Sequence, residues 1–385
     1  MHHSRLLRGG WGSSPWMAAA LCLVTSGGCG GSPRPETEAH PGGVSLLMAD
    51  GEPPVLGSAD APPGYSLVWG DEFENSTVDS SKWNTFENSN YGSSNKEDQC
   101  YFARNVSVGG GTLKITARRE TVTCGATNPD TGTRTYYFTS GFLTTRNQGG
   151  PLKFKFRYGY TEARIKMPKG NPYWGAFWLV GPGDGSTPGT WPAYGEFDVT
   201  ELLGARPDLT HGTFHYACTG RASCNTSSAA MYNVRTGDSY QGSSNFGPQL
   251  TPSNFVDGET STRFVRYGFL WQPDRITWYV DGKPMRYLDA DGNLYRYRPD
   301  GSKVFDRSLT SVFPNNPPTS PLSTVFAYEH SIHLNLAFGG GFPRYSTYGY
   351  TGIETATGYS DGNLAATLPA AMEVDYVRVF RLPGQ

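Results

Sequence analysis

The sequence is poor in charge and lacks long apolar runs. Charged residues make up only 17% of the 385 residues, the formal net charge is −2, and no basic stripe or polybasic run occurs. Proteins that bind nucleic acid concentrate Lys and Arg on one face, so this composition argues against nucleic acid as a partner. No apolar stretch reaches the roughly 20 residues that a spanning helix requires, which argues against a helical membrane segment.

Residues 1–28 have the order of an export signal. Arg5 and Arg8 precede a short apolar segment at 16–24, and small residues then lead to Cys29. This order predicts a signal peptide at 1–28 and a protein that is secreted or held in the outer cell envelope. Cys29 also resembles a bacterial lipoprotein site, so membrane attachment through a lipid on Cys29 and ordinary cleavage nearby are both retained.

Residues 29–63 are rich in Gly, Pro, Ala, Ser and Glu and carry little apolar pattern. Such a composition cannot bury a core, because too few of its side chains gain from leaving water. We therefore expect a flexible tether at 29–63 and an ordered domain at 64–385.

Four cysteines lie in the expected domain, and an even number in an exported chain indicates disulfides. Pairing Cys218 with Cys224 would close a short loop and leave Cys100 with Cys124; free buried thiols are the alternative. No C-x-x-C pair or His cluster accompanies these residues, so a zinc site is not indicated.

Glycine and aromatic residues are abundant, with 49 Gly and 14% aromatics. Short segments that alternate apolar and polar residues recur at 112–118, 160–167, 264–271, 275–280 and 373–380. A period of two is typical of half-buried strands, and Asp281-Gly282 is a hairpin signal. The pattern predicts an all-β fold, an antiparallel sandwich. Two polar segments, at about 219–262 and 289–323, are expected to be long loops, either walls of a cleft or insertions.

Three carboxylates fall within one strand-like segment, at Glu196, Asp198 and Glu201. On a regular strand Glu196 and Asp198 share a face, and Glu201 would point into the core, where a charge is costly. A one-residue β-bulge between Asp198 and Glu201 returns Glu201 to the face of the other two. Two carboxyl groups about 5–5.5 Å apart are what a retaining glycosidase requires, and a third can tune their pKa values. An ordinary solvated strand edge or a calcium site is the alternative.

These features resemble glycoside hydrolase family 16, and within it the bacterial endo-β-1,3-glucanases, or laminarinases. The segment from Glu196 to Glu201 matches the bulged form of the family motif, Glu-x-Asp-x-x-Glu. Further matches follow in the family's order from about 65 to 382, at 67–73, 95–101, 160–178, 271–282, 334–340 and 374–380.

The resemblance implies a β-jelly-roll sandwich of two antiparallel sheets with a concave substrate cleft. It implies a retaining enzyme with Glu196 as nucleophile, Glu201 as acid/base and Asp198 supporting the pair through a hydrogen bond, with no cofactor required for the chemistry. The implied substrate is a β-1,3 or mixed β-1,3/1,4 glucan. Sugar rings stack on flat aromatics and their hydroxyls need polar partners, which gives six substrate-binding candidates: Asn95, Glu97, Trp174, Trp178, Trp191 and His215.

The resemblance also implies a structural calcium ion on the convex side, with Asp375 as carboxylate ligand and backbone oxygens near Glu72 and Gly111. A simple hydrogen-bonding role for Asp375 is the alternative, and Trp178 can instead be a core residue. The Trp that laminarinases often carry after the catalytic strand is missing. A hydrolase of agar-like or carrageenan-like galactans is therefore a second candidate function, and a non-catalytic β-glucan-binding protein is a third. We expect a monomer.

Overall fold

The computed structural model describes residues 52–89, 95, 97–128, 132–182, 191, 194–205, 207, 209–217, 231–236, 260–298, 301–308, 328–340, 342–343, 353–355, 358–360 and 366–385. The predicted signal peptide, Cys29 and the Cys218–Cys224 pair lie outside these residues. Val44–Gln385 forms one compact unit. Its described part is built from strands, one 3-10 turn, η1 (Ala103–Asn105), and a helical pair at 342–343, and it holds no helix long and apolar enough to cross a membrane.

Most of the described strands belong to two sheets. The larger comprises β1 (Ser66–Asp71), β3 (Gln99–Tyr101), β4 (Val106–Val108), β5 (Leu113–Asn128), β6 (Gly132–Ser140), β8 (Gly159–Lys166), β13 (Val265–Trp271), β14 (Ile276–Val280), β15 (Lys283–Leu288), β16 (Asn293–Tyr297), β17 (Lys303–Ser308) and β21 (Ala370–Arg381). The smaller comprises β2 (Asn84–Thr85), β7 (Phe142–Thr144), β9 (Tyr173–Val180), β10 (Glu196–Leu203), β11 (His211–Ala217), β12 (Met231–Thr236) and β18 (Ser331–Phe338). A separate hairpin pairs β19 (Ile353–Thr355) with β20 (Gly358–Ser360).

The strand order places sequence-distant segments side by side. The larger sheet runs β17-β16-β15-β14-β13-β8-β21-β5-β6-β3, with β1 on β21 and β4 on β5. The smaller sheet runs β12-β11-β10-β9-β18-β7-β2. Neighbouring strands are antiparallel except for β3, which lies parallel to β6.

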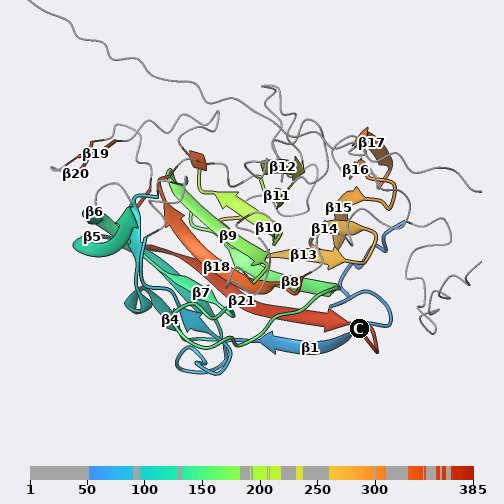
Figure 1. Cartoon of the computed structure of the whole chain (residues 1–385), viewed down its shortest axis with the longest axis horizontal. Coiled ribbons are helices and arrows are strands. Elements are labelled where there is room, and N and C mark those ends of the chain that lie inside the picture. The colour runs from blue at the N-terminus through green and yellow to red at the C-terminus, as the bar shows by residue number, and fades with distance from the viewer. Residues whose placement is uncertain are drawn as a thin grey trace, which may run out of the picture. The chain divides into compact units, whose positions relative to one another are not determined.

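One large apolar core lies between the two sheets. Alternation along each strand produces it, because every second side chain points inward. Phe197 of β10 and Leu179 of β9 enter this core from the smaller sheet, and Ile165 of β8 and Phe269 of β13 enter it from the larger. Figure 1 shows β9 and β18 in one layer and β8 and β21 in the other. Burial of these side chains is the dominant stabilising contribution to the fold. The two sheets packed on this core confirm the predicted all-β sandwich.

The predicted hairpin at 280–282 is present between β14 and β15. Val280 pairs with Lys283, so Asp281 and Gly282 form a two-residue loop. Their φ angles are +49° and +72°, as a type I′ turn requires. This turn matches the twist of the flanking strands and fixes their register.

The ordered domain begins earlier than the sequence predicts, so the tether assignment is wrong for residues 52–63. Leu56 is buried with Tyr279 and Phe380 in a small cluster on the larger sheet. The Arg266 guanidinium donates hydrogen bonds to the carbonyls of Gly57 and Ala59. A few well-placed contacts therefore hold a segment whose composition alone predicts disorder.

The expectation of one long loop at 289–323 is also wrong in part. Residues 293–297 and 303–308 form β16 and β17, which extend the larger sheet beyond β15. Tyr295 of β16 lies between Tyr287 and Phe305. Its ring centroid is 6.0 Å from that of Tyr287 and 5.8 Å from that of Phe305. These cross-strand aromatic pairs stabilise strands that are otherwise polar.

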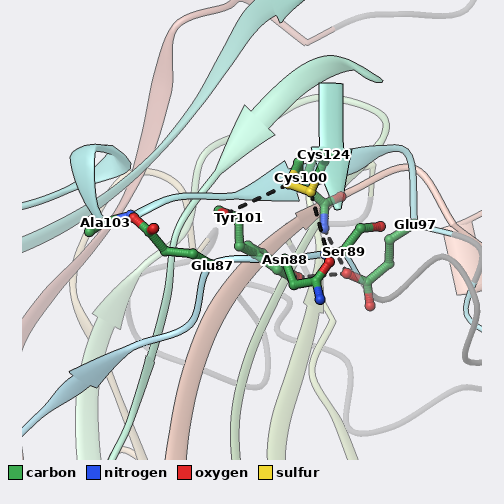
Figure 2. Close-up of a disulfide and its surroundings, with 9 residues drawn as sticks. Glu87, Asn88, Ser89, Glu97, Cys100, Tyr101, Ala103 and Cys124 are labelled. Atoms are coloured by element: carbon green, nitrogen blue, oxygen red, sulfur yellow. Dashed lines mark hydrogen bonds between the residues drawn. A yellow bond between two sulfur atoms is a disulfide. The ribbon is translucent and has the colours of Figure 1, made fainter. Parts of the chain in front are cut away.

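The predicted pairing of Cys100 with Cys124 is confirmed. The disulfide joins β3 to β5, with the two Cα atoms 6.2 Å apart. Figure 2 shows the disulfide near Tyr101 and Glu97, two members of the polar network described below. Both cysteines are buried.

Candidate active site

A β-bulge in β10 arranges the three carboxylates. The register of β10 against β11 shifts between Asp198 and Glu201, and against β9 it shifts between Asp198 and Thr200. The bulge predicted from the spacing is therefore present where it was expected. Gly195, with φ of +80°, begins the segment in a backbone conformation that favours glycine.

The bulge places Glu196, Asp198 and Glu201 on one face of the smaller sheet. They pair with Val180, Trp178 and Ala176 of β9, which are alternate residues and therefore share a face. The residues between them, including Phe197 and Val199, lie in the core on the opposite face. The acidic face therefore points away from the larger sheet.

Glu196 lies in a pocket of hydrogen-bonding side chains. Trp191 Nε1 donates to Glu196 Oε2 at 2.8 Å, and His215 Nε2 lies 3.6 Å from Glu196 Oε1. Burial, followed by the negative charge of Asp198, raises the pKa of Glu196 to about 8, while His215 and the Trp191 hydrogen bond act in the opposite direction. Trp191 is 36% exposed, so its indole ring remains accessible beside the carboxylate.

Glu201 is held by two donors from neighbouring strands. Trp174 Nε1 of β9 donates to Glu201 Oε1 at 3.1 Å, and Thr213 Oγ1 of β11 donates to Glu201 Oε2 at 3.4 Å. Both Glu201 and Trp174 are buried. Trp174 therefore contacts a carboxylate, a role that is additional to the sugar stacking that its residue type suggested.

Asp198 is oriented by a histidine. His215 Nε2 of β11 lies 2.9 Å from Asp198 Oδ2, within hydrogen-bond distance. Because the same nitrogen lies near Glu196, His215 connects Asp198 with Glu196. The sequence predicted that Asp198 supports the two glutamates through a hydrogen bond; in the structure its partner is His215, which lies between Asp198 and Glu196.

Asn95 and Glu97 belong to a buried polar network. The Glu97 carboxylate accepts hydrogen bonds from Asn95 Nδ2, Gln99 Nε2 and Tyr101 OH at 3.2, 2.6 and 2.6 Å. Glu97 is only 2% exposed. Its carboxylate oxygens are engaged by protein donors, which favours a supporting position over direct contact with a sugar; Figure 2 shows Glu97 close to the disulfide.

The same network reaches Trp178 through residues that the sequence did not single out. Asn335 Nδ2 of β18 donates to Tyr101 OH at 3.1 Å, and Trp178 Nε1 donates to Asn335 Oδ1 at 2.8 Å. His333 stacks on Trp178, with centroids 4.2 Å apart. Asn335 and Tyr101 lie in segments that match the family, but their linking role depends on contacts between distant strands.

The side chains of two residues at the predicted calcium site pair with arginines. Asp375 Oδ2 accepts a hydrogen bond from Arg164 at 2.5 Å, and Glu72 accepts two from the Arg378 guanidinium, both at 2.8 Å. The carboxylate beside Gly111 belongs to Glu74.

Among the described residues, Glu196, Asp198 and His215 do offer ligand atoms within 4.8 Å of one another. Two of them are carboxylates of the acidic face, and His215 is the histidine that lies against both.

A surface depression of about 390 Å³ lies elsewhere. It is lined by Arg104, Arg118, Arg119, Glu120, Leu368 and Pro369. Its residues come from η1, β5 and the segment before β21, and none of them belongs to the acidic face.

Among protein-family models, the one described as the GH16 domain of β-porphyranases A–D matches residues 68–302. A β-glucanase of Rhodothermus marinus is 31% identical over 340 residues, covering 85% of this chain and 90% of that protein. A glucan endo-1,3-β-glucosidase A1 of Niallia circulans is 30% identical over 347 residues, covering 87% of this chain but only 41% of that longer protein.

Solved structures share the fold. The catalytic domain of an endo-1,3-β-glucanase (laminarinase) from Thermotoga petrophila is 27% identical, with a TM-score of 0.57, and the match covers 83% of this chain and 99% of that one. The laminarinase from Rhodothermus marinus is 26% identical, with a TM-score of 0.52, covering 82% of this chain and 97% of that one. These similarities confirm the predicted jelly-roll sandwich.

Proposed function

Because the chain belongs to glycoside hydrolase family 16, we propose that it is a retaining endo-β-glucanase that cuts β-1,3 or mixed β-1,3/1,4 glucans. The observation that carries the proposal is the bulge in β10, which turns Glu196 and Glu201 to one face. The relatives named as β-1,3-glucanases support the choice of polymer.

In the proposed first step, the Glu196 carboxylate attacks the anomeric carbon and Glu201 gives its proton to the departing glycosidic oxygen. The bond between sugar and leaving group breaks as the bond between sugar and Glu196 forms. In the second step Glu201 takes a proton from water, which attacks the same carbon and releases Glu196. The chemistry requires no cofactor.

The surrounding residues would prepare these two carboxyl groups. The Trp191 hydrogen bond stabilises the ionised form of Glu196, and it would direct the second oxygen toward the sugar. The Trp174 and Thr213 donors fix the orientation of Glu201. The exposed part of Trp191 offers an apolar surface on which a sugar ring would stack.

The roles of the two glutamates can be separated with azide and an activated aryl β-glucoside. The Glu201→Ala variant should form the covalent intermediate, and azide should capture it as the β-glycosyl azide. The Glu196→Ala variant should instead give the α-glycosyl azide, because azide replaces the missing carboxylate. The opposite pattern would exchange the two roles.

A galactan hydrolase is the second candidate function, and the family match favours keeping it. The sequence model that matches residues 68–302 describes β-porphyranases, and a κ-carrageenase of Pseudoalteromonas carrageenovora is 29% identical over 278 residues. The catalytic carboxylates would be the same, and only the substrate contacts would differ.

The purified protein should be incubated with laminarin, lichenan, agarose, porphyran and carrageenan, and the released oligosaccharides identified. Laminarin or lichenan fragments support the glucanase. Fragments from a galactan alone would replace it with the second candidate, and binding of laminarin without cleavage would indicate a non-catalytic protein.

A structural calcium ion stays a separate prediction. The Glu74 carboxylate favours it, because its oxygens lie beside Gly111 and carboxylate oxygens are ligands that calcium prefers. The arginine partner of Asp375 weakens it, because Arg164 already neutralises the one carboxylate that the prediction uses. A rise in melting temperature on adding Ca²⁺, absent in a Glu74→Gln variant, would support the site. If the wild-type protein melted at the same temperature in Ca²⁺ and in EGTA, the predicted calcium site would be refuted.

Export is the remaining part of the proposal, supported only by the sequence of residues 1–29. A secreted or envelope-bound glucanase meets polymers that cannot enter the cell. Metabolic labelling with a fatty acid should mark the wild-type protein and spare the Cys29→Ala variant if Cys29 carries a lipid. Release of unlabelled wild-type protein would instead indicate ordinary cleavage.

A further inference from the structure

We infer that Trp278 is a positioning residue for the proposed reaction. Its indole N–H holds the main-chain carbonyl of Asp198 and thereby fixes the bulge that presents Glu201. This inference rests on the proposed function, but it concerns a residue on the opposite sheet that touches no substrate.

The contact crosses the core between the two sheets. Trp278 belongs to β14 of the larger sheet, and its Nε1 donates to Asp198 O in β10 at 3.0 Å. Trp278 is 3% exposed. The Asp198 carboxylate lies on the acidic face, while its carbonyl meets a donor from the core, so the residue is held from both sides.

The bulge explains why a side-chain donor is found at this carbonyl. A bulge disrupts the regular ladder, because two residues of one strand oppose a single residue of its neighbour. A buried backbone carbonyl without a partner costs free energy, so the displaced groups must be satisfied in another way. The indole N–H satisfies one of them at the residue where the register shifts.

The alternative conformation of β10 would be inactive. In a regular register Glu201 would turn into the core, on the side of Phe197 and Val199. The hydrogen bond from Trp278 stabilises the bulged register and not the regular one. It therefore contributes to the alignment of Glu201 with Glu196.

Aromatic packing fixes the donor itself. The Trp278 ring meets Phe269 of β13 edge to face, with centroids 5.2 Å apart, and stacks at 6.4 Å on Phe214 of β11. Phe214 pairs with Phe197 in the strand register, so the ring lies beneath both β10 and β11. The indole has little room to follow a carbonyl that moves.

The test removes only the N–H group. Replacing Trp278 by β-(3-benzothienyl)alanine keeps the shape of the ring and substitutes sulfur for the nitrogen. We expect kcat to fall about 10- to 100-fold on the polymer that the wild-type protein cuts, because small displacements of catalytic groups cost this much. KM should change less than about twofold, because substrate binding does not use Trp278.

Trp271 provides the matched control. It is fully buried in the same core, and its Nε1 has no hydrogen-bond partner among the described residues. The same replacement at Trp271 should leave kcat unchanged. An equal loss of kcat in both variants would mean that ring chemistry, and not the Asp198 contact, matters, and would overturn the inference.

A second readout does not depend on activity. Hydrogen exchange of the backbone amides in Glu196–Leu203 should accelerate in the variant at Trp278 and stay at the wild-type rate in the variant at Trp271. Unchanged exchange at both positions would refute the role of Trp278, whatever the enzyme does. A wild-type protein that cuts none of the polymers would refute the proposed function alone, since the exchange result would still decide whether Trp278 holds the bulge.

Discussion

Replacing Glu196 by Gln should stabilise the fold at alkaline pH, a result that needs no knowledge of the substrate. The pKa of Glu196 rises from 4.5 to about 8 in the folded protein because the carboxylate is buried beside Asp198. Gln carries no charge, and its carbonyl oxygen can still accept the Trp191 hydrogen bond. The substitution therefore removes the cost of ionising this position and keeps its main contact.

The direction and size of the effect follow from linkage. Because the folded pKa is raised, the favourable contribution of protonated Glu196 is fully present below about pH 4.5 and is lost as the pH rises through about 8. Each pKa unit corresponds to about 1.4 kcal/mol, so the cost above pH 8 reaches about 3–5 kcal/mol. It will be smaller where neighbouring carboxyl groups share the proton.

Urea unfolding of both proteins, measured at about pH 4.5 and about pH 9, provides the assay. The free energies of unfolding should agree at the lower pH, and the Glu196→Gln variant should be the more stable at the higher pH. Glu120→Gln is the control of opposite sign, because a hydrogen bond from Thr139 lowers the pKa of Glu120. A Glu196→Gln variant that is less stable than wild type at pH 9 would refute the reasoning.

Three further predictions concern the neighbours of Glu196 and the buried network around Glu97. Asp198→Asn should move the acidic limb of the kcat/KM profile to lower pH, because the charge that raises the pKa of Glu196 is gone. Trp191→Phe should lower kcat/KM about tenfold and move that limb to higher pH, because a hydrogen bond to a charged group is lost. Tyr101→Phe should reduce the free energy of unfolding by about 1–3 kcal/mol in denaturation. Tyr279→Phe should not, because it removes a buried hydroxyl that has no hydrogen-bond partner within the described part of the chain.

Two of these changes have a control variant, and each of the three has an outcome that would contradict it. Trp69→Phe removes an indole from β1, far from the acidic face in the strand order, and should keep full activity. If the acidic limb of the kcat/KM profile moved to higher pH in the Asp198→Asn variant, the electrostatic explanation would be contradicted. A Trp191→Phe variant with wild-type kcat/KM would show that its hydrogen bond is dispensable. Equal stability of the Tyr101 and Tyr279 variants would mean that the buried network contributes nothing.

The sequence could predict the bulge because strand geometry leaves little choice. Side chains alternate with a period of two, so Glu196 and Glu201 can share a face only if one residue is inserted between Asp198 and Glu201. The turn at Asp281-Gly282 was predictable for the same local reason, because few residues adopt positive φ.

Contacts between distant segments could not be predicted in this way. Nothing near Glu97 in the sequence shows that Tyr101 and Asn335 would link it to Trp178. Nothing near Asp198 shows that its carbonyl would meet Trp278 across the core. These contacts depend on sheet order, which the alternating pattern of a single strand does not specify.

The composition of residues 52–63 could not predict that they pack against the domain, for a different reason. The segment is held by the buried side chain of Leu56, by three buried prolines, and by backbone carbonyls that accept hydrogen bonds from Arg266. Average hydrophobicity does not register such contacts, because the energy comes from a few positions and from backbone atoms that every residue carries.

The most direct test of the paired carboxylates is the configuration of the first product. Proton NMR during the initial phase of polymer cleavage reports the new reducing end before its anomers equilibrate. If Glu196 is the nucleophile and Glu201 the acid/base, the reaction is a double displacement that retains the configuration. The β-anomer should therefore appear first. Initial release of the α-anomer would contradict the double displacement and the role given to Glu196.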